Sequence, residues 1–69
     1  MKISARNVLK GTVKTVTHGV VNSEVIVKLS GGAELVSTIT KTSAVHLGIK
    51  KGKKVLAIIK ASNVILGTE

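Results

Sequence analysis

Two short runs, one near each end of the sequence, combine a cation with small hydroxyl or amide side chains. The first is Ser4-Ala5-Arg6-Asn7 and the second is Lys60-Ala61-Ser62-Asn63. Arginine supplies a rigid fork of donors, lysine a mobile point charge, and serine and asparagine short hydrogen-bonding groups. Because neither run contains a carboxylate or an aromatic ring, this chemistry suits a small oxyanion and offers no surface for base stacking. The alternative is that Arg6 and Lys60 are ordinary surface cations.

The composition describes a single small domain, residues 1–69, with little capacity to stabilise itself. The chain has 69 residues, no Cys and an apolar fraction of 43% without any aromatic residue. A chain of this size has marginal stability without a disulfide, a metal or a partner subunit, so we expect self-association. The net charge of +8 attracts anions, including nucleic acid, acidic lipid and small oxyanions. No signal peptide or transmembrane helix is visible, and we expect a cytoplasmic protein without a membrane partner.

The hydrophobic pattern predicts an all-β fold. Alternation of apolar and polar residues, with turn signals between the runs, predicts five strands, at 4–17, 20–30, 33–40, 54–60 and 64–66. A short helix is expected at about 42–47, between the third and fourth strands. This order is that of the five-stranded OB-type barrel.

The predicted helix has its own start and stop signals. Thr42 or Ser43 is suited to its N-cap and Gly48 to its C-terminal end. The apolar residues expected to fix the helix to the sheet are Val45, Leu47 and Ile49.

Some predicted strands are apolar on both faces. The strand at 54–60 has Leu56 and Ile58 opposite its other apolar face, and Ile26 and Val36 are similar cases. Such a strand is either central in a sheet or covered by another chain. A lone barrel of this size would expose these side chains, so we expect a homo-oligomer built partly by pairing strand edges.

An ordered set of short motifs spans nearly the whole chain. In sequence order the motifs are Ser4-Ala5-Arg6-Asn7 with Leu9 and Gly11, Gly19-Val20-Val21-Asn22-Ser23-Glu24-Val25, Ile39-Thr40 with Ser43, Leu47-Gly48 with Gly52, and Lys60-Ala61-Ser62-Asn63-Val64. With this set the chain resembles the molbindin (Mop) family, small molybdate-binding proteins whose fold also occurs as the TOBE domain of molybdate transporters and regulators.

The resemblance implies a ligand, an assembly and a set of site residues. The family binds molybdate and tungstate as intact oxyanions between subunits, and its single-domain members are hexamers, trimers of dimers. Hydrogen bonds hold the ligand, and no side chain coordinates the metal directly. By resemblance, the residues at the oxyanion are Ser4, Arg6, Lys60 and Ala61, with Thr40 from a neighbouring subunit and Asn7 and Ser43 as supporting candidates. The loop Gly19-Val20-Val21 is the candidate for a second oxyanion site. The chain is more basic than expected for the family, which leaves room for an extra anionic partner.

No arrangement of residues in the sequence suggests an enzyme. Glu24 and Glu34 are the only internal acids, and no Ser has a nearby His–Asp partner. His18 and His46 are too few and too far apart to suggest a metal site. By the resemblance, the expected function is intracellular storage or homeostasis of molybdenum as the oxyanion.

Two other functions stay open at this point. One is an OB-type nucleic-acid-binding module acting by electrostatics, but without aromatic side chains its binding would be weak at physiological salt, so nucleic acid is an unlikely partner. The other is a regulatory oligomer in which the anion only holds the subunits together.

Overall fold

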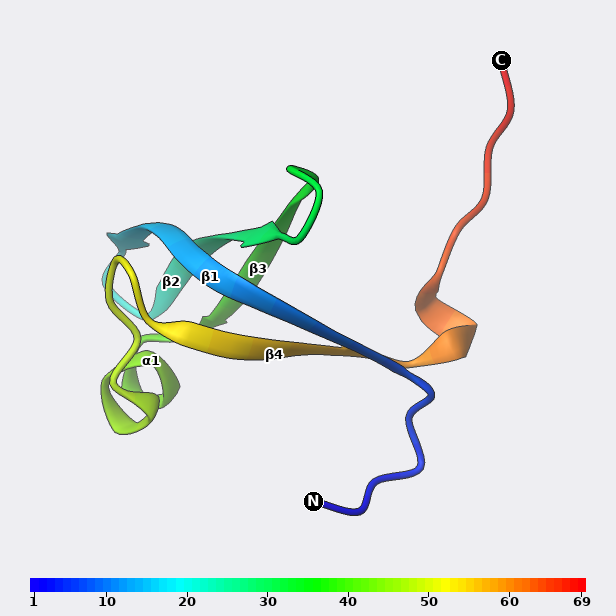
Figure 1. The fold of residues 1–69 in the computed structure, drawn as a ribbon. Helices are drawn as coiled ribbons and strands as arrows, with labels where there is room; N and C mark the ends of the chain where they lie inside the picture. Colours follow the sequence, from blue (N-terminus) through cyan, green and yellow to red (C-terminus); the bar gives the residue numbers. More distant parts are fainter.

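A four-stranded antiparallel sheet, curled into half a barrel, forms most of the molecule (Figure 1). The computed structural model describes residues 1–69. Its elements are β1 (Asn7–His18), β2 (Asn22–Leu29), β3 (Glu34–Thr40), α1 (Lys41–Leu47), β4 (Lys54–Ile59) and the 3-10 turn η1 (Ala61–Asn63). The strand order is β3-β2-β1-β4, so β1 is the long central strand. No helix has the length and apolar character needed to span a bilayer.

The strand β1 holds the two halves of the sheet together. Its N-terminal half pairs with β4, from Asn7 opposite Ile59 to Thr12 opposite Lys54. Its C-terminal half pairs with β2, and the register shifts between Val13 and Thr15. A shift of this kind is a β-bulge, which bends a strand and increases its twist. The bend lets one strand belong to two differently directed parts of the curled sheet.

The fifth strand of the predicted barrel is absent within the single chain. The segment 64–66 is extended, but it pairs with nothing, and Ile65 and Leu66 are 93% and 90% exposed. A strand needs a partner edge, and the turn at η1 directs this segment away from the sheet (Figure 1). The order of the first four strands and the helix agrees with the prediction, while the count of five is wrong. The barrel is open, with β3 and β4 as its two edges.

The core lies on the face that the alternation in β2 predicts. Val13, Val25 and Val27 are the buried centre. Half-buried side chains pack around them, namely Val16, Leu29, Leu35, Ile39, Ile49 and Val55. Only 5 of 69 residues are buried, which is a small core even for a short chain.

The helix α1 packs through different residues from those predicted. Its N-cap is Thr40, whose Oγ1 accepts a hydrogen bond from the Ser43 backbone N–H at 3.0 Å. Gly48 ends the helix in the left-handed conformation, as predicted, with φ of 67°. Val45 and Leu47 are 69% and 56% exposed, so neither fixes the helix to the sheet.

Ala44 and Ile49 make that contact instead. Ala44 is 1% exposed, and its small side chain allows the helix backbone close to the sheet. The turn at Gly48 brings the Ile49 N–H back to the Ala44 carbonyl at 2.9 Å and places Ile49 against the core. The prediction for Ile49 is therefore confirmed.

The strand β4 is an edge strand, so its two apolar faces do not mean a central position. Leu56 and Ile58 are 46% and 47% exposed. On the neighbouring strand Val8 lies opposite Ile58 and is also exposed. Val36 on the other edge strand is 67% exposed. Coverage of these side chains by another chain stays a prediction.

Candidate functional site

The pairing of β1 with β4 brings together the two cationic runs that lie far apart in the sequence. Asn7 is opposite Ile59, so Arg6 and Lys60 are the next residues outward on adjacent strands. The Asn7 side-chain Nδ2 donates a hydrogen bond to the Ile59 carbonyl at 3.3 Å, which fixes this register. Both terminal segments leave the sheet at this end (Figure 1). We call this group the strand-end half-site; its residues are Ser4, Arg6, Asn7, Lys60 and Ala61.

The strand-end half-site is rich in unused donors. Ser4, Arg6 and Lys60 are exposed, and the single salt bridge of the structure, Lys14–Glu34 at 2.6 Å, does not involve them. In the turn that follows, the Lys60 and Ala61 carbonyls accept bonds from Asn63 and Val64, while the backbone N–H groups of Ala61 and Ser62 have no acceptor within the chain. Two cations and several neutral donors are suited to binding an anion with many acceptor oxygens.

Asn7 has a positioning role in this arrangement. Its amide nitrogen is engaged with the β4 backbone, and its remaining Oδ1 is an acceptor, which an anion does not need. The structure therefore brings five of the predicted site residues to one end of the sheet, and gives one of them a structural task.

Thr40 and Ser43 lie elsewhere, at the start of α1, and we call them the helix-cap half-site. Thr40 Oγ1 donates a hydrogen bond to Ser43 Oγ at 2.8 Å and accepts one from the Ser43 N–H. The Ser43 hydroxyl thus keeps its own hydrogen for another acceptor. Thr40 is both a helix cap and a member of the predicted site.

The two half-sites are at opposite ends of the sheet. Thr40 lies opposite Asn22, beside the end of β1 at His18, whereas the strand-end half-site adjoins the start of β1 at Asn7. The strand has 12 residues, so its ends are separated by about 36 Å along its course. One chain cannot present Arg6 and Thr40 to the same small anion.

The loop predicted as a second oxyanion site lies against the helix start. The Gly19 N–H is already used, by the Asn22 carbonyl at 2.7 Å, and the Val21 carbonyl accepts the Lys41 N–H at 2.7 Å. The N–H groups of Val20 and Val21 have no acceptor in the chain. A shallow depression of about 490 Å³ is lined here by Val20, Val21, Lys41, Thr42 and Val45.

Lys41 is the residue in this depression that the sequence reasoning missed. Its position directly after Thr40 could have indicated it. Thr40 is the N-cap, so Lys41 is the first residue of α1, and its N–H bonds to the Val21 carbonyl in the loop. It supplies the charge that the loop Gly19-Val20-Val21 itself lacks.

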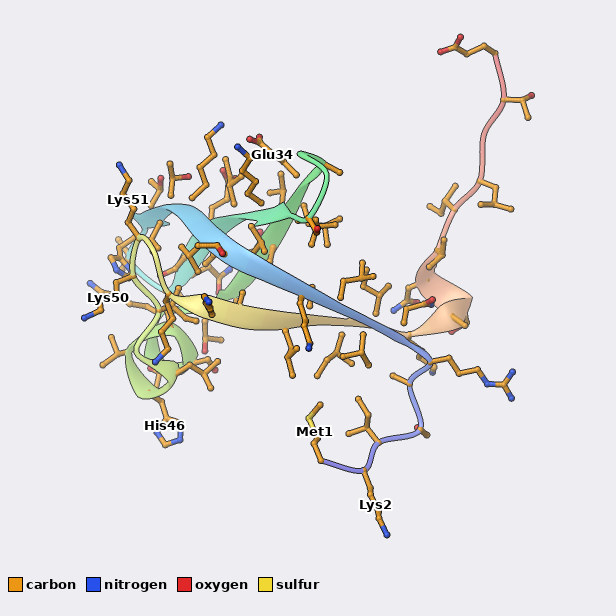
Figure 2. All side chains as sticks on the ribbon, in the orientation of Figure 1. Met1, Lys2, Glu34, His46, Lys50 and Lys51 are labelled. Carbon is orange, nitrogen blue, oxygen red and sulfur yellow. The ribbon has the colours of Figure 1, made fainter.

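Neither histidine lies in a cluster that could bind a metal. His18 Nδ1 is 2.6 Å from the Oγ of Ser23, which is fully buried, and His46 lies at the exposed end of α1 (Figure 2). No group of three or more His, Cys, Asp or Glu side chains is close enough to hold a metal ion. Glu34 lies at the β2–β3 hairpin (Figure 2) and forms a salt bridge with Lys14.

Comparison with known proteins places this geometry in a family. Residues 3–66 match the TOBE domain model. The chain is 45% identical over 69 residues to a "Probable molybdenum-pterin-binding protein" of Haemophilus influenzae, with both chains covered in full. It is 41% identical over 66 residues to "Molybdenum-pterin-binding protein 2" of Clostridium pasteurianum, covering 96% of this chain and 97% of the relative.

Two solved structures share the fold. The first, MopII from Clostridium pasteurianum in an apo form, superimposes with a TM-score of 0.92 at 39% identity, covering 97% of this chain and 100% of that one. The second, the cytoplasmic molybdate-binding protein ModG with molybdate bound, gives a TM-score of 0.96 at 52% identity, covering 100% of this chain and 49% of that one. The chain belongs to the TOBE domain family, and within it to the molbindin (Mop) group of molybdenum-pterin-binding proteins.

Proposed function

We propose that this protein binds molybdate as an intact oxyanion, with tungstate as an analogue, at sites shared between subunits. The observation that carries the proposal is the Asn7–Ile59 pairing, which sets Arg6 and Lys60 side by side without any carboxylate. The relatives support the ligand, since one is named for molybdenum-pterin binding and another was solved with molybdate bound.

The donors of the strand-end half-site suit a tetrahedral dianion. Arg6 and Lys60 balance its two charges, and the Ser4 hydroxyl and the N–H groups near Ala61 saturate the remaining oxygen lone pairs. Charge-assisted hydrogen bonds contribute about 1.5–3 kcal/mol each. Several together reach about −8 kcal/mol, which corresponds to micromolar affinity, after the costs of ordering are subtracted. Because serine and backbone donors are neutral, they add hydrogen bonds with a small desolvation cost.

A second chain completes the site in this proposal. The separation of Thr40 and Ser43 from Arg6 within one chain supports it, because the helix-cap half-site can reach the anion only from a neighbouring subunit. The assembly is a homo-oligomer, a hexamer arranged as a trimer of dimers. The loop Gly19-Val20-Val21, with Lys41, forms the second and weaker oxyanion site, near the symmetry axes.

The role that follows is storage or homeostasis of molybdenum in the cytoplasm, by binding without catalysis. Nucleic acid is not the ligand in this proposal, because the chain has no aromatic residue on which bases could stack. The alternative, in which the anion only holds the subunits together, would make assembly of the oligomer strictly dependent on the oxyanion.

Calorimetric titration of the purified protein with molybdate tests the proposal. We expect micromolar binding that tungstate reproduces and a large excess of sulfate does not abolish, with a stoichiometry that reports the sites per oligomer. A parallel titration with single-stranded DNA at physiological salt should give no heat. Crystals grown with excess tungstate that show no heavy atom beside Arg6 or Lys60 would overturn the proposal.

A further inference from the structure

Three lysines gather on the outer face of the sheet, away from both half-sites. The register places Lys28 of β2 and Lys54 of β4 on either side of Thr12 of β1. The neighbouring pair Val13 and Val27 is buried, so this row faces outward. Lys10 precedes Thr12 by two residues and therefore lies on the same face. We call Lys10, Lys28 and Lys54 the basic face.

No carboxylate neutralises the basic face. Glu34 is opposite Lys28 in the register and is the nearest acid, but its carboxylate is held by Lys14 Nζ at 2.6 Å. The three lysines themselves make no salt bridge and no side-chain hydrogen bond within the chain. The proposed oxyanion sites use Arg6, Lys60 and Lys41, so they leave this concentration of charge unexplained.

A shallow groove runs over the basic face. It has a volume of about 570 Å³ and is lined by the three lysines together with Gly11, Thr12, Leu29, Ser30, Val55 and Leu56. Leu56 belongs to the apolar surface that we predict another chain covers, so the groove lies beside that predicted interface. The hydroxyls of Thr12 and Ser30 add neutral donors between the charges and at one end of the groove. The chain has no aromatic residue, so nothing in the groove can stack on a base or a pterin ring.

The spacing of the charges distinguishes between kinds of anion. Adjacent strands are about 4.8 Å apart, so the Cα atoms of Lys28 and Lys54, two strands apart, are separated by roughly 10 Å. To reach one tetrahedral oxyanion, the three ammonium groups would have to converge against their mutual repulsion. A chain of linked phosphates spreads its charges over a longer span, so the lysine side chains have to converge less. A nucleic acid strand gains much of its affinity from bases stacked on aromatic side chains, and this chain has none.

We propose that the basic face binds a short chain of linked phosphates, as found in inorganic tripolyphosphate and in the triphosphate group of a nucleotide. Lys10, Lys28 and Lys54 each take up a phosphate charge, and Thr12 and Ser30 donate to the oxygens between them. This binding is separate from molybdate binding and uses none of its residues.

Calorimetry with sodium tripolyphosphate at physiological salt tests the proposal on the whole protein. The test variant is Lys28→Gln/Lys54→Gln, and the matched control is Lys50→Gln/Lys51→Gln, which removes the same charge from the turn before β4 (Figure 2). We expect the test variant to bind tripolyphosphate at least about tenfold more weakly, and the control to stay within about twofold of the unmodified protein. Lys28→Arg/Lys54→Arg should retain binding, and molybdate affinity should be unchanged in all variants.

The comparison ligands identify the source of the phosphate chain. ATP binding with the same lysine dependence would point to a nucleotide, and binding of tripolyphosphate without ATP would point to the inorganic chain. Equal losses in the test and control variants would show attraction by net charge alone and would overturn the proposal. Orthophosphate binding as tight as tripolyphosphate, tighter binding of oligo-dT, or no heat with tripolyphosphate would overturn it too.

Discussion

Arg6 is exposed directly before β1 and has no carboxylate partner. The pairing of Asn7 with Ile59 places Arg6 beside Lys60. A cation in this setting is free to bind an anion, and its charge-assisted hydrogen bonds are worth about 1.5–3 kcal/mol each. Arg6→Ala should therefore lower molybdate affinity at least about tenfold, and Lys50→Ala, which removes an equally exposed charge, should leave it within about twofold. Calorimetry measures both. Unchanged affinity in Arg6→Ala would exclude Arg6 from the site.

Ser43 and Thr40 require different substitutions, because only one of them supports the helix. In Ser43→Ala the backbone N–H still reaches Thr40 Oγ1, so the helix cap survives while the free hydroxyl is lost. We expect about fivefold weaker molybdate binding and little change in the urea midpoint, since a neutral hydrogen bond contributes about 1 kcal/mol.

Thr40→Ala is the contrasting variant, and it should cost about 1 kcal/mol of folding stability through the lost cap. Thr40→Ser should restore that stability. A Ser43→Ala protein with unchanged molybdate affinity would exclude the Ser43 hydroxyl from the site.

The two runs of the strand-end half-site can be recognised from residue types, because Arg, Lys and Ser without acids stand out in the sequence. The resemblance to the Mop family joined the runs into one predicted site, and their binding of an oxyanion stays a prediction. The sequence could not show which of the polar residues have structural roles. Asn7 and Thr40 are both polar residues of the predicted site, yet one joins β1 to β4 and the other caps α1. Those roles depend on strand register and on where the helix begins, and both are set by contacts between distant residues.

At the scale of the elements, α1 shows the limits of periodicity. Larger apolar residues were expected to face the sheet, but the helix has only 7 residues and one buried position, which Ala44 occupies. Strands were easier to predict, because alternation in β2 identifies the core face directly and Val25 and Val27 are buried on it. A two-turn helix offers too few residues for its apolar face to be distinguished from chance.

Gly48 is the residue on which the packing of α1 depends. Its φ of 67° lies in the left-handed region, and the turn it makes directs Ile49 into the core. Gly48→Ala should destabilise the fold by about 1–2 kcal/mol, because a Cβ is unfavourable at this φ. Gly67→Ala, at a glycine without positive φ and with nothing near its Cβ position, is the matched control and should be neutral. Urea denaturation of both variants, followed by circular dichroism, measures the difference; equal midpoints would contradict the strain argument.

At the scale of the whole molecule, the single chain leaves sheet edges unpaired and apolar side chains uncovered. The sheet has two free edges, the core is small, and the segment 64–66 is extended with its apolar side chains in solvent. The sequence predicted that segment as a strand, and its residue types are those of one. It pairs with neither free edge of its own sheet, because η1 turns it away, so a fifth strand could form between chains where it does not form within one.

This reasoning predicts that the tail holds the oligomer together. The protein should elute as a multimer near six chains in size-exclusion chromatography with light scattering, in keeping with the trimer of dimers proposed above. Ile65→Asp/Leu66→Asp should shift it to smaller species, and Thr68→Asp should not. A wild-type protein that is monomeric at all concentrations would refute the interface. A double variant that still forms the multimer would show that the tail is not needed for assembly.

The separation of the two half-sites can be tested by mixing subunits. If each site takes Arg6 from one chain and Ser43 from another, then Arg6→Ala and Ser43→Ala chains damage opposite halves of the same site. Equal mixing with random exchange should regenerate about one quarter of the sites in intact form, since each half is then undamaged in half of the cases. Subunits are unfolded together and refolded, mixed assemblies are confirmed by mass spectrometry, and molybdate is titrated by calorimetry. The control is the double variant Arg6→Ala/Ser43→Ala mixed with itself, in which every site is damaged twice. Verified mixed oligomers that recover no tight sites would overturn the proposal that each site takes Arg6 from one chain and Ser43 from another.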